Sequence, residues 1–279
     1  MVTIAEENRV GVLLRGWRER RRMSQLELAL EAGVSARHLS FVETGRSRPS
    51  PDMVLHLADR LEVPLRERNH LLLAAGYAPR FEARTLDDPE LSHVRDALGR
   101  VLAGHEPYPA IAVDRRWNLV ASNGALDPLL EGIDPELLMP PVNAMRLALA
   151  PGGLAPRIRN LGEWRSHLLS RLHRQVDLTG DAELTALRDE LLAYPGPPPE
   201  SHGPAAGAIM VELHLAAPGG GELRFFSTVT TFGTAVDITV AELAVEAFFP
   251  ADAATAQRLR HGGGPPPPGD TSARDVWSS

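Results

Sequence analysis

Residues 24–51 bring arginines and small polar side chains together at close spacing, and these are residue types that recognise anions. Arg37 follows a serine within the expected first turn of a helix, and Arg46 and Arg48 follow a glycine. An arginine guanidinium can donate two parallel hydrogen bonds, to a phosphate or to the two major-groove acceptors of guanine. The segment therefore indicates non-covalent recognition, with nucleic acid as the natural counterpart.

Covalent chemistry has little support in the sequence. The chain has no cysteine, which excludes disulfides, thiolate metal sites and cysteine nucleophiles. Its ten histidines form no HExxH pattern, and neither a GxSxG motif nor a phosphate-binding glycine loop is present. We expect no catalytic residues, no metal and no cofactor, and hence no enzyme. For Asp237, Glu242 and Glu246 we expect solvated acids on a strand edge rather than paired catalytic carboxylates.

Five short helices are predicted up to Phe81, because start and stop signals recur along this part of the chain. Ser24 and Glu27 form a capping box, in which each side chain binds the backbone N–H of the other residue. Gly33 suits the left-handed residue that ends a helix, and Ser50, followed by proline, suits the start of another. The residues that we expect to be buried in the first two helices are Val10, Leu13, Leu14, Trp17, Leu26, Ala29 and Leu30.

The order of elements in residues 24–51 is helix, glycine turn and second helix, with small Ala29 where the two helices cross and Val34 closing the core. One face of the 35–44 helix is then free to enter a major groove, which is wide enough for a helix. Over roughly residues 10–76 the chain resembles the phage-repressor, or Xre-type, helix-turn-helix family.

This resemblance implies binding to a double-stranded DNA operator, as a homodimer, because one recognition helix reads too few base pairs. It assigns a phosphate contact to Gln25 and base contacts to residues early in the 35–44 helix, with Arg37 favoured. Arg46 and Arg48 are expected on phosphates, with His38 as a phosphate neighbour or a bystander. The complete set is Gln25, Ser35, Ala36, Arg37, His38, Ser40, Phe41, Arg46 and Arg48. For the run 18–22 a solvated face and a DNA contact both stay open.

Charge is divided unevenly along the chain. The whole chain has a net charge of -7, whereas the part up to Thr85 has 14 arginines against 11 acidic residues. A mildly basic first part thus precedes an acidic remainder, which would repel DNA. This favours DNA binding through the first part alone.

The remainder predicts an α+β domain with an antiparallel sheet. Residues 110–113 and 117–121 are β-prone and are separated by Asp114-Arg-Arg116, which indicates a hairpin. Amphipathic helices are expected at 161–176 and 182–193, and further strands at 208–215, 222–231 and 236–248.

Residues 109–123, which contain Asp114-Arg-Arg-Trp-Asn118, follow a repressor-type first domain, and the combination resembles the MmyB-like (MltR-like) regulators over roughly residues 93–259. The resemblance implies a PAS-like second domain that binds a fatty-acid-like or other small apolar ligand. Residues 195–199, Pro-Gly-Pro-Pro-Pro, depart from the apolar continuation common in such families, which leaves the ligand class open. Two interpretations of one set of residues stay open, a lining of the ligand cavity and plain apolar core: Val113, Trp117, Val120, Leu126, Leu129, Leu130, Phe225 and Phe232.

The sequence thus predicts a multidomain chain: an all-α five-helix helix-turn-helix domain at 1–81, a linker at 82–92, an α+β PAS-like domain at 93–261 and a disordered Gly/Pro-rich tail at 262–279. We expect a sequence-specific transcription regulator, a repressor, whose second domain senses a small apolar ligand. In one alternative, the second domain binds a protein partner or only dimerises; in another, it is a cofactor-bearing sensor or enzyme. With no signal peptide and no long apolar run, we expect a cytoplasmic protein without a membrane partner.

Overall fold

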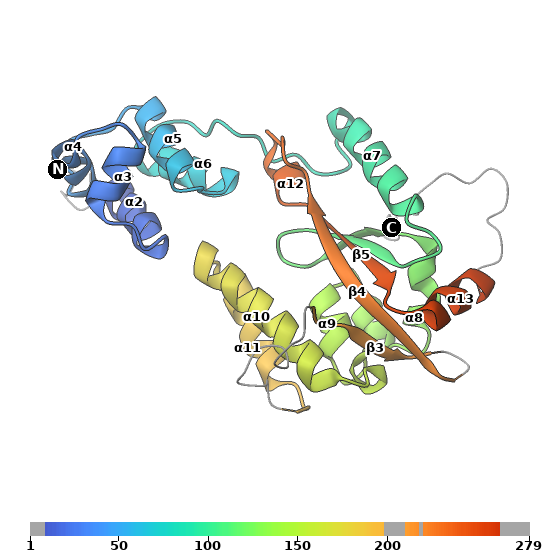
Figure 1. Cartoon of the computed structure of the whole chain (residues 1–279). Coiled ribbons are helices and arrows are strands. Elements are labelled where there is room, and N and C mark those ends of the chain that lie inside the picture. The colour runs from blue at the N-terminus through green and yellow to red at the C-terminus, as the bar shows by residue number, and fades with distance from the viewer. Residues whose placement is uncertain (1–8, 198–209, 218–219, 263–279) are drawn as a thin grey trace. The chain divides into compact units, whose positions relative to one another are not determined.

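The computed structural model describes residues 9–197, 210–217 and 220–262 (Figure 1). The predicted tail beyond Gly262, most of the proline-rich loop and the start of the strand expected at 208–215 lie outside these residues. The chain divides into two compact units. Unit 1 comprises Met1–Thr85 and Gly233–Ala241, and unit 2 comprises Leu86–Phe232 and Glu242–Ser279. The domain limits expected from the sequence stay a prediction.

Unit 1 contains the five predicted helices, which confirms the all-α interpretation of the first part of the chain. They are α2 (Arg9–Arg20), α3 (Gln25–Glu31), α4 (Ala36–Glu43), α5 (Pro51–Arg60) and α6 (Leu65–Ala74). The capping box is formed: the Glu27 N–H donates to the Ser24 hydroxyl at 3.2 Å, and the Ser24 N–H donates to the Glu27 carboxylate at 2.6 Å. The bond from the Ser24 backbone lowers the pKa of Glu27. Gly33 has φ +63°, as its expected role at the helix end requires.

The core of unit 1 differs from the expected one on α3. Leu28 and Ala29 are buried, whereas Leu26 and Leu30 are 60% and 72% exposed. Because residues four apart share a helix face and residues two apart point in nearly opposite directions, a stripe centred on Leu28 leaves Leu26 and Leu30 outside. Leu13 on α2 is likewise exposed. The expectation that these three leucines are buried was wrong.

Unit 2 is an α+β unit, as predicted. Its α-helices are α7 (Ser92–Ala103), α8 (Asp127–Leu130), α9 (Ala144–Leu149), α10 (Leu161–Thr179), α11 (Ala182–Ala193) and α13 (Ala253–Gly262). Short 3-10 helices lie at Pro89–Leu91, Gly124–Leu126, Pro135–Leu138 and Ala155–Arg157. The strands are β1 (Ala110–Val113), β2 (Leu119–Ser122), β3 (Leu213–Ala216), β4 (Glu222–Thr231) and β5 (Ala244–Pro250). The helices α9 and α13 were not predicted from the sequence.

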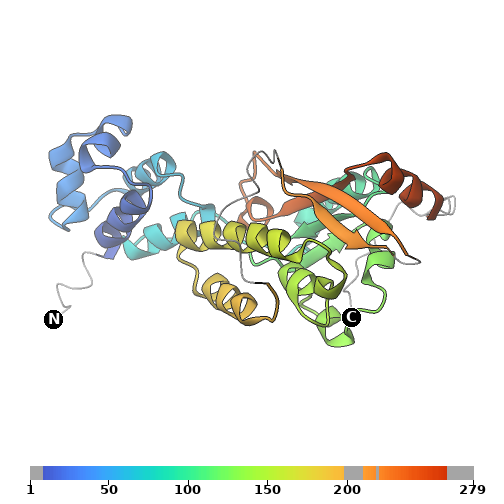
Figure 2. The same ribbon diagram turned by 60° about the horizontal axis from the view of Figure 1, so that its bottom comes forward.

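The five strands form one sheet in the order β2-β1-β5-β4-β3, and every neighbouring pair is antiparallel. Because side chains alternate along a strand, the sheet has two packed faces. Ile111 and Val113 join the larger apolar cluster with residues of α10 and α11, while Ala110 and Ala112 join a smaller cluster with α7. The helices α10 and α11 lie side by side in both views (Figures 1 and 2).

The segment expected as one strand at 236–248 contains a helix instead. Asp237 accepts hydrogen bonds from the backbone N–H groups of Thr239 and Val240 and so starts α12 (Ile238–Ala241). The strand β5 begins only at Ala244. Asp237 and Glu246 are 6% and 4% exposed, which overturns the expectation of solvated acids. None of the described helices is long and apolar enough to span a bilayer.

Candidate DNA interface and ligand-binding domain

The pair α3–α4 presents the surface predicted to meet DNA. Ser35 caps α4 by accepting from the His38 N–H at 3.1 Å, and the Val34 N–H donates to the Ala29 carbonyl at 2.9 Å. These bonds fix the turn between the helices. Arg37, in the first turn of α4, is exposed.

A buried ion pair holds α4 against α2. The Arg18 guanidinium donates to both carboxylate oxygens of Glu43, at 2.7 and 2.9 Å. Their side chains are 9% and 1% exposed. The hydrogen bond to Glu43 raises the pKa of Arg18. Arg18 also donates to the Met23 carbonyl at 2.8 Å, so one side chain joins α2, the turn before α3 and the end of α4.

Sequence reasoning missed this pair. Arg18 stands first in the charged run 18–22, for which only a solvated face and a DNA contact were considered, but it is buried. The one available signal was its spacing: Arg18 follows buried Leu14 by four residues and therefore shares its helix face. Arg20 and Arg21 lie over the Trp17 ring instead.

Gln25 is part of the same network. Its amide Nε2 donates to Glu43 at 2.7 Å, and its side chain is half-buried at the first position of α3. The buried carboxylate therefore orients a residue that was predicted to contact phosphate.

The Phe41 ring lies close to two of the predicted DNA-binding arginines. The guanidinium carbons of Arg37 and Arg46 lie 5.3 and 5.9 Å from the centre of its ring. A cation over an aromatic face is attracted by about 0.5–1 kcal/mol at an exposed site. The ring thus holds both charged groups near the same part of α4.

Arg48 is engaged in a different way. Its Nε and Nη2 donate to the Ala75 carbonyl at 3.2 and 2.8 Å, and the guanidinium lies over the Tyr77 ring. Arg48 is exposed, but these bonds tie the loop after α4 to the end of α6. All nine residues predicted to bind DNA lie in unit 1, on α3, on α4 and its cap, or in the loop after α4: Gln25, Ser35, Ala36, Arg37, His38, Ser40, Phe41, Arg46 and Arg48.

Six of the eight residues expected to face a ligand share the larger apolar cluster of unit 2. They are Val113, Trp117, Leu126, Leu129, Leu130 and Phe225. Val120 packs instead against the smaller cluster under α7. Phe232 is half-buried, follows the last residue of β4 and belongs to neither cluster.

A chain of polar contacts crosses the side of unit 2 that holds the larger cluster. Glu246 on β5 pairs with Arg171 of α10 at 3.0 Å and accepts from the Ser227 hydroxyl at 2.8 Å. The Arg171 guanidinium lies 4.3 Å from the centre of the Trp117 ring. The Trp117 indole N–H in turn donates to Gln175 at 2.9 Å. Buried polar groups of this kind orient their neighbours only when each has a partner, and each of these has one.

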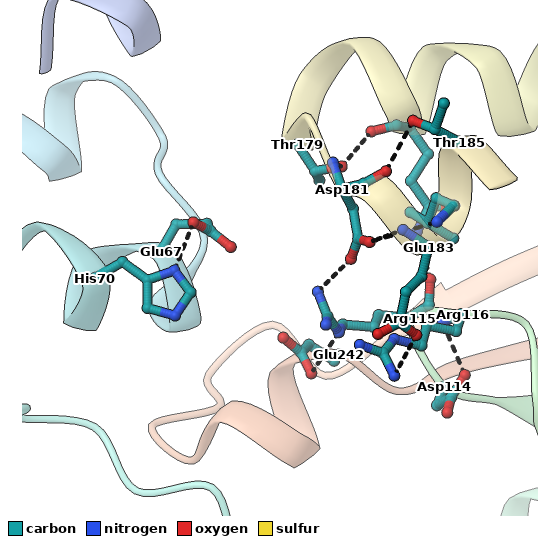
Figure 3. Close-up of polar contacts among 12 residues, drawn as sticks. Glu67, His70, Asp114, Arg115, Arg116, Thr179, Asp181, Glu183, Thr185 and Glu242 are labelled. Carbon is teal, nitrogen blue, oxygen red and sulfur yellow. Dashed lines mark hydrogen bonds and ion pairs between the residues drawn. The ribbon is translucent and has the colours of Figure 1, made fainter. Parts of the chain in front are cut away.

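The Asp-Arg-Arg-Trp turn between β1 and β2 is fixed to the corner between α10 and α11 (Figure 3). Arg115 pairs with Asp181, the N-cap of α11, at 2.7 Å, and Arg116 pairs with Glu183 at 2.5 Å. Trp117 has φ +68°, a conformation that bulky residues rarely adopt. Its backbone N–H donates to the Asp114 carbonyl at 3.1 Å. The turn thus holds the Trp117 backbone in a strained conformation, and such strain persists only where surrounding contacts fix it.

His167, one turn before Arg171 on α10, stacks on Trp164 with ring centres 5.4 Å apart. Burial lowers the pKa of His167, and the nearby positive charge of Arg171 adds to this shift. Among the described residues, no group of three His, Asp or Glu could hold a metal ion.

Two family models match the chain. The sequence model described as the MmyB-like transcription regulator ligand binding domain matches residues 94–261, and one described as a helix-turn-helix domain matches residues 9–71. The chain belongs to the MmyB-like transcription regulators. Both resemblances inferred from the sequence are thereby confirmed, and the chain is a DNA-binding transcription regulator with a ligand-binding domain. No curated protein matches it closely enough to count as a relative.

Removing Glu43 should destabilise unit 1 of this MmyB-like regulator strongly. Glu43→Ala leaves the buried Arg18 guanidinium without its partner, and breaking a buried pair in this way costs about 3–5 kcal/mol. Amide hydrogen exchange in α2 and α4 measures the opening free energy. Glu19→Ala, which breaks the exposed Arg15–Glu19 pair on α2, is the control and should change little. Equal effects of the two substitutions would contradict this role for Glu43.

Acid should destabilise unit 2 partly through His167. Because its pKa is lowered in the folded state, the unfolded chain binds the proton more tightly. His167 therefore costs no stability at pH values above its ordinary pKa of 6.5, and the free energy of unfolding falls as the pH drops below that value. His167→Phe keeps a ring against Trp164 and should reduce the difference in melting temperature between about pH 7.5 and about pH 5.5. His173→Gln, an exposed change on the same helix, should leave that difference as it is.

Proposed function

We propose that this regulator binds operator DNA with the first turn of α4 in the major groove. Arg37 reads a base, while Gln25, Arg46 and Arg48 contact phosphates. The observation that carries the proposal is the placement of exposed Arg37 and Arg46 next to the same Phe41 ring. Because the Arg18–Glu43 pair fixes α4, these side chains are presented in a preformed arrangement, which lowers the entropic cost of binding.

The bound form is a homodimer on an inverted repeat, with half-sites about one helical turn apart. A single recognition helix contacts too few base pairs for genomic specificity, so two copies are needed. The protein acts as a repressor in the cytoplasm, and no catalytic step is part of the proposal.

The second domain senses a small apolar ligand, and a fatty-acyl chain is the class that we favour. Support comes from the description of the matching family as a ligand-binding domain and from the larger apolar cluster that gathers Val113, Trp117 and Phe225. A sheet covered by helices supports a PAS-like interpretation. An apolar site with a few fixed polar groups suits an apolar ligand with one polar end, and the Glu246–Arg171 pair supplies such groups.

Two substitutions should separate base reading from phosphate binding. Arg37→Ala should weaken operator binding by about 1–3 kcal/mol and relax the preference at one base position. Arg46→Ala should weaken binding to all duplexes alike and reduce the slope of affinity against salt by about one. Affinities over a salt series, measured with operator and scrambled duplexes, decide this. Sequence-independent losses from both variants would contradict the assigned roles.

A bound ligand should be found in purified protein. Mass spectrometry of an organic extract should reveal an acyl chain at about one equivalent per chain, because a matched apolar site retains such a molecule. A stoichiometric co-purifying protein with no extractable small molecule would favour the alternative of a partner-binding domain. A visible absorption band would instead indicate a cofactor-bearing sensor.

A further inference from the structure

Residues 233–241, which connect β4 to β5, belong to the same compact unit as the helix-turn-helix helices. The strands on either side belong to unit 2, and the last rung between them pairs Thr231 with Ala244. The chain therefore crosses between the two units three times, after Thr85, Phe232 and Ala241. A loop that only reversed the chain between two strands would need about two to five residues. The connection from β4 to β5 is longer and contains α12.

An ion pair joins this segment to the chain that follows α6. The Asp237 carboxylate pairs with Nη1 of Arg84 at 3.1 Å and accepts from the Arg84 backbone N–H at 3.4 Å. Its other oxygen caps α12 by accepting from the Thr239 N–H at 2.8 Å. Since Asp237 is only 6% exposed, removing its charge would weaken hydrogen bonds that water cannot readily replace.

Backbone bonds and apolar packing act at the same place. The Ile238 N–H donates to the Glu82 carbonyl at 2.8 Å, and the Thr239 hydroxyl donates to the Arg84 carbonyl at 2.5 Å. Ile238 and Val240 are 2% and 7% exposed, and α12 packs against α6. Residues more than 150 positions apart are thus joined by three kinds of interaction.

The strand that leaves this segment is fixed within unit 2. Glu242, directly after α12, lies 3.9 Å from Nε of Arg115, which also pairs with Asp181 (Figure 3). Glu246, further along β5, is buried against Arg171. A shift of β4 or β5 in the ligand-binding domain would therefore reach residues 233–241 through the backbone.

We propose that residues 233–241 are an intramolecular docking segment, through which the ligand-binding domain controls the DNA-binding unit. The segment is docked by Asp237, Ile238 and Val240 against residues 81–85 and α6. The docked segment packs on α6, and the carbonyl of Ala75 at the end of α6 holds Arg48, which we propose as a phosphate contact. When the segment is released, this order must be regained on binding DNA, and affinity falls. The docking itself stands on the contacts above, and only its effect on DNA rests on the proposed function.

Hydrogen exchange of the whole chain tests the docking. Asp237→Asn keeps the shape and one acceptor but removes the charge that faces Arg84, and Ile238→Ala removes only buried apolar atoms. Each variant should speed amide exchange in residues 81–85 and in 238–241 together, by about tenfold or more. Asp59→Asn, which breaks the Arg68–Asp59 pair of the same unit, should leave both stretches unchanged. If residues 81–85 exchange as in the wild-type chain, the docking proposal is wrong.

Operator affinity of the same variants, without added ligand, tests the control. Asp237→Asn and Ile238→Ala should bind operator about fivefold or more weakly, a typical size for coupling between sites. Asp59→Asn should bind like the wild type. Faster exchange with unchanged affinity would show docking without control and overturn this part of the proposal. If the wild type and Asp59→Asn bound no duplex, the proposed function would fail, while hydrogen exchange would still decide the docking.

Discussion

Arg18 and Glu43 form the interaction on which the surface proposed to face DNA depends. A helical unit of this size has a small core and little stability to spare, so a polar contact that adds to the packing of Leu39 and Val42 helps to fix the position of α4. Two parallel hydrogen bonds in a nearly dry environment determine both the distance and the orientation of the helix end. A buried pair adds little net stability compared with apolar residues of the same volume. Its contribution here is geometric.

In the ligand-binding domain, alternate residues of β5 point to opposite faces of the sheet. Val245 and Ala247 point to the cluster under α7, while Ala244 and Phe248 pack on the larger cluster and Glu246 lies between them. A carboxylate in such a place needs partners, and it takes them from α10 and β4. The apolar side of the sheet is therefore not uniformly apolar, and its polar contacts continue through Trp117 to the turn after β1.

Local signals were enough to predict much of this structure. The five helices of unit 1 follow from caps such as Ser24 and Ser50, whose partners are three residues away. The hairpin of β1 and β2 follows from the turn that begins at Asp114. The positions of Gln25 and Arg37 on α3 and α4 could be predicted for the same reason, because each lies just after a cap.

Two of the errors concern interactions between distant residues. Glu246 was expected in solvent because its partner Arg171 is 75 positions away, and Asp237 because Arg84 is 153 positions away. The prediction of a strand at 236–248 was wrong for a different reason. Ile238, Thr239 and Val240 favour strands, but the cap supplied by Asp237 and packing against α6 stabilise a helix. For Leu26 and Leu30, a helix as short as α3 offered too few turns for periodicity to identify the buried face.

The placement of residues 233–241 bears on how such regulators can diversify. Recombination that exchanged only the first 85 residues would transfer a DNA-binding unit without the part of it encoded much later in the gene. The transferred DNA-binding unit would then lie beside the α12 of another protein, whose Asp237 and Ile238 would have no matching partners. Operator preference and ligand response should accordingly be inherited together. A hybrid regulator should need residues 233–241 to be transferred together with the first 85 residues.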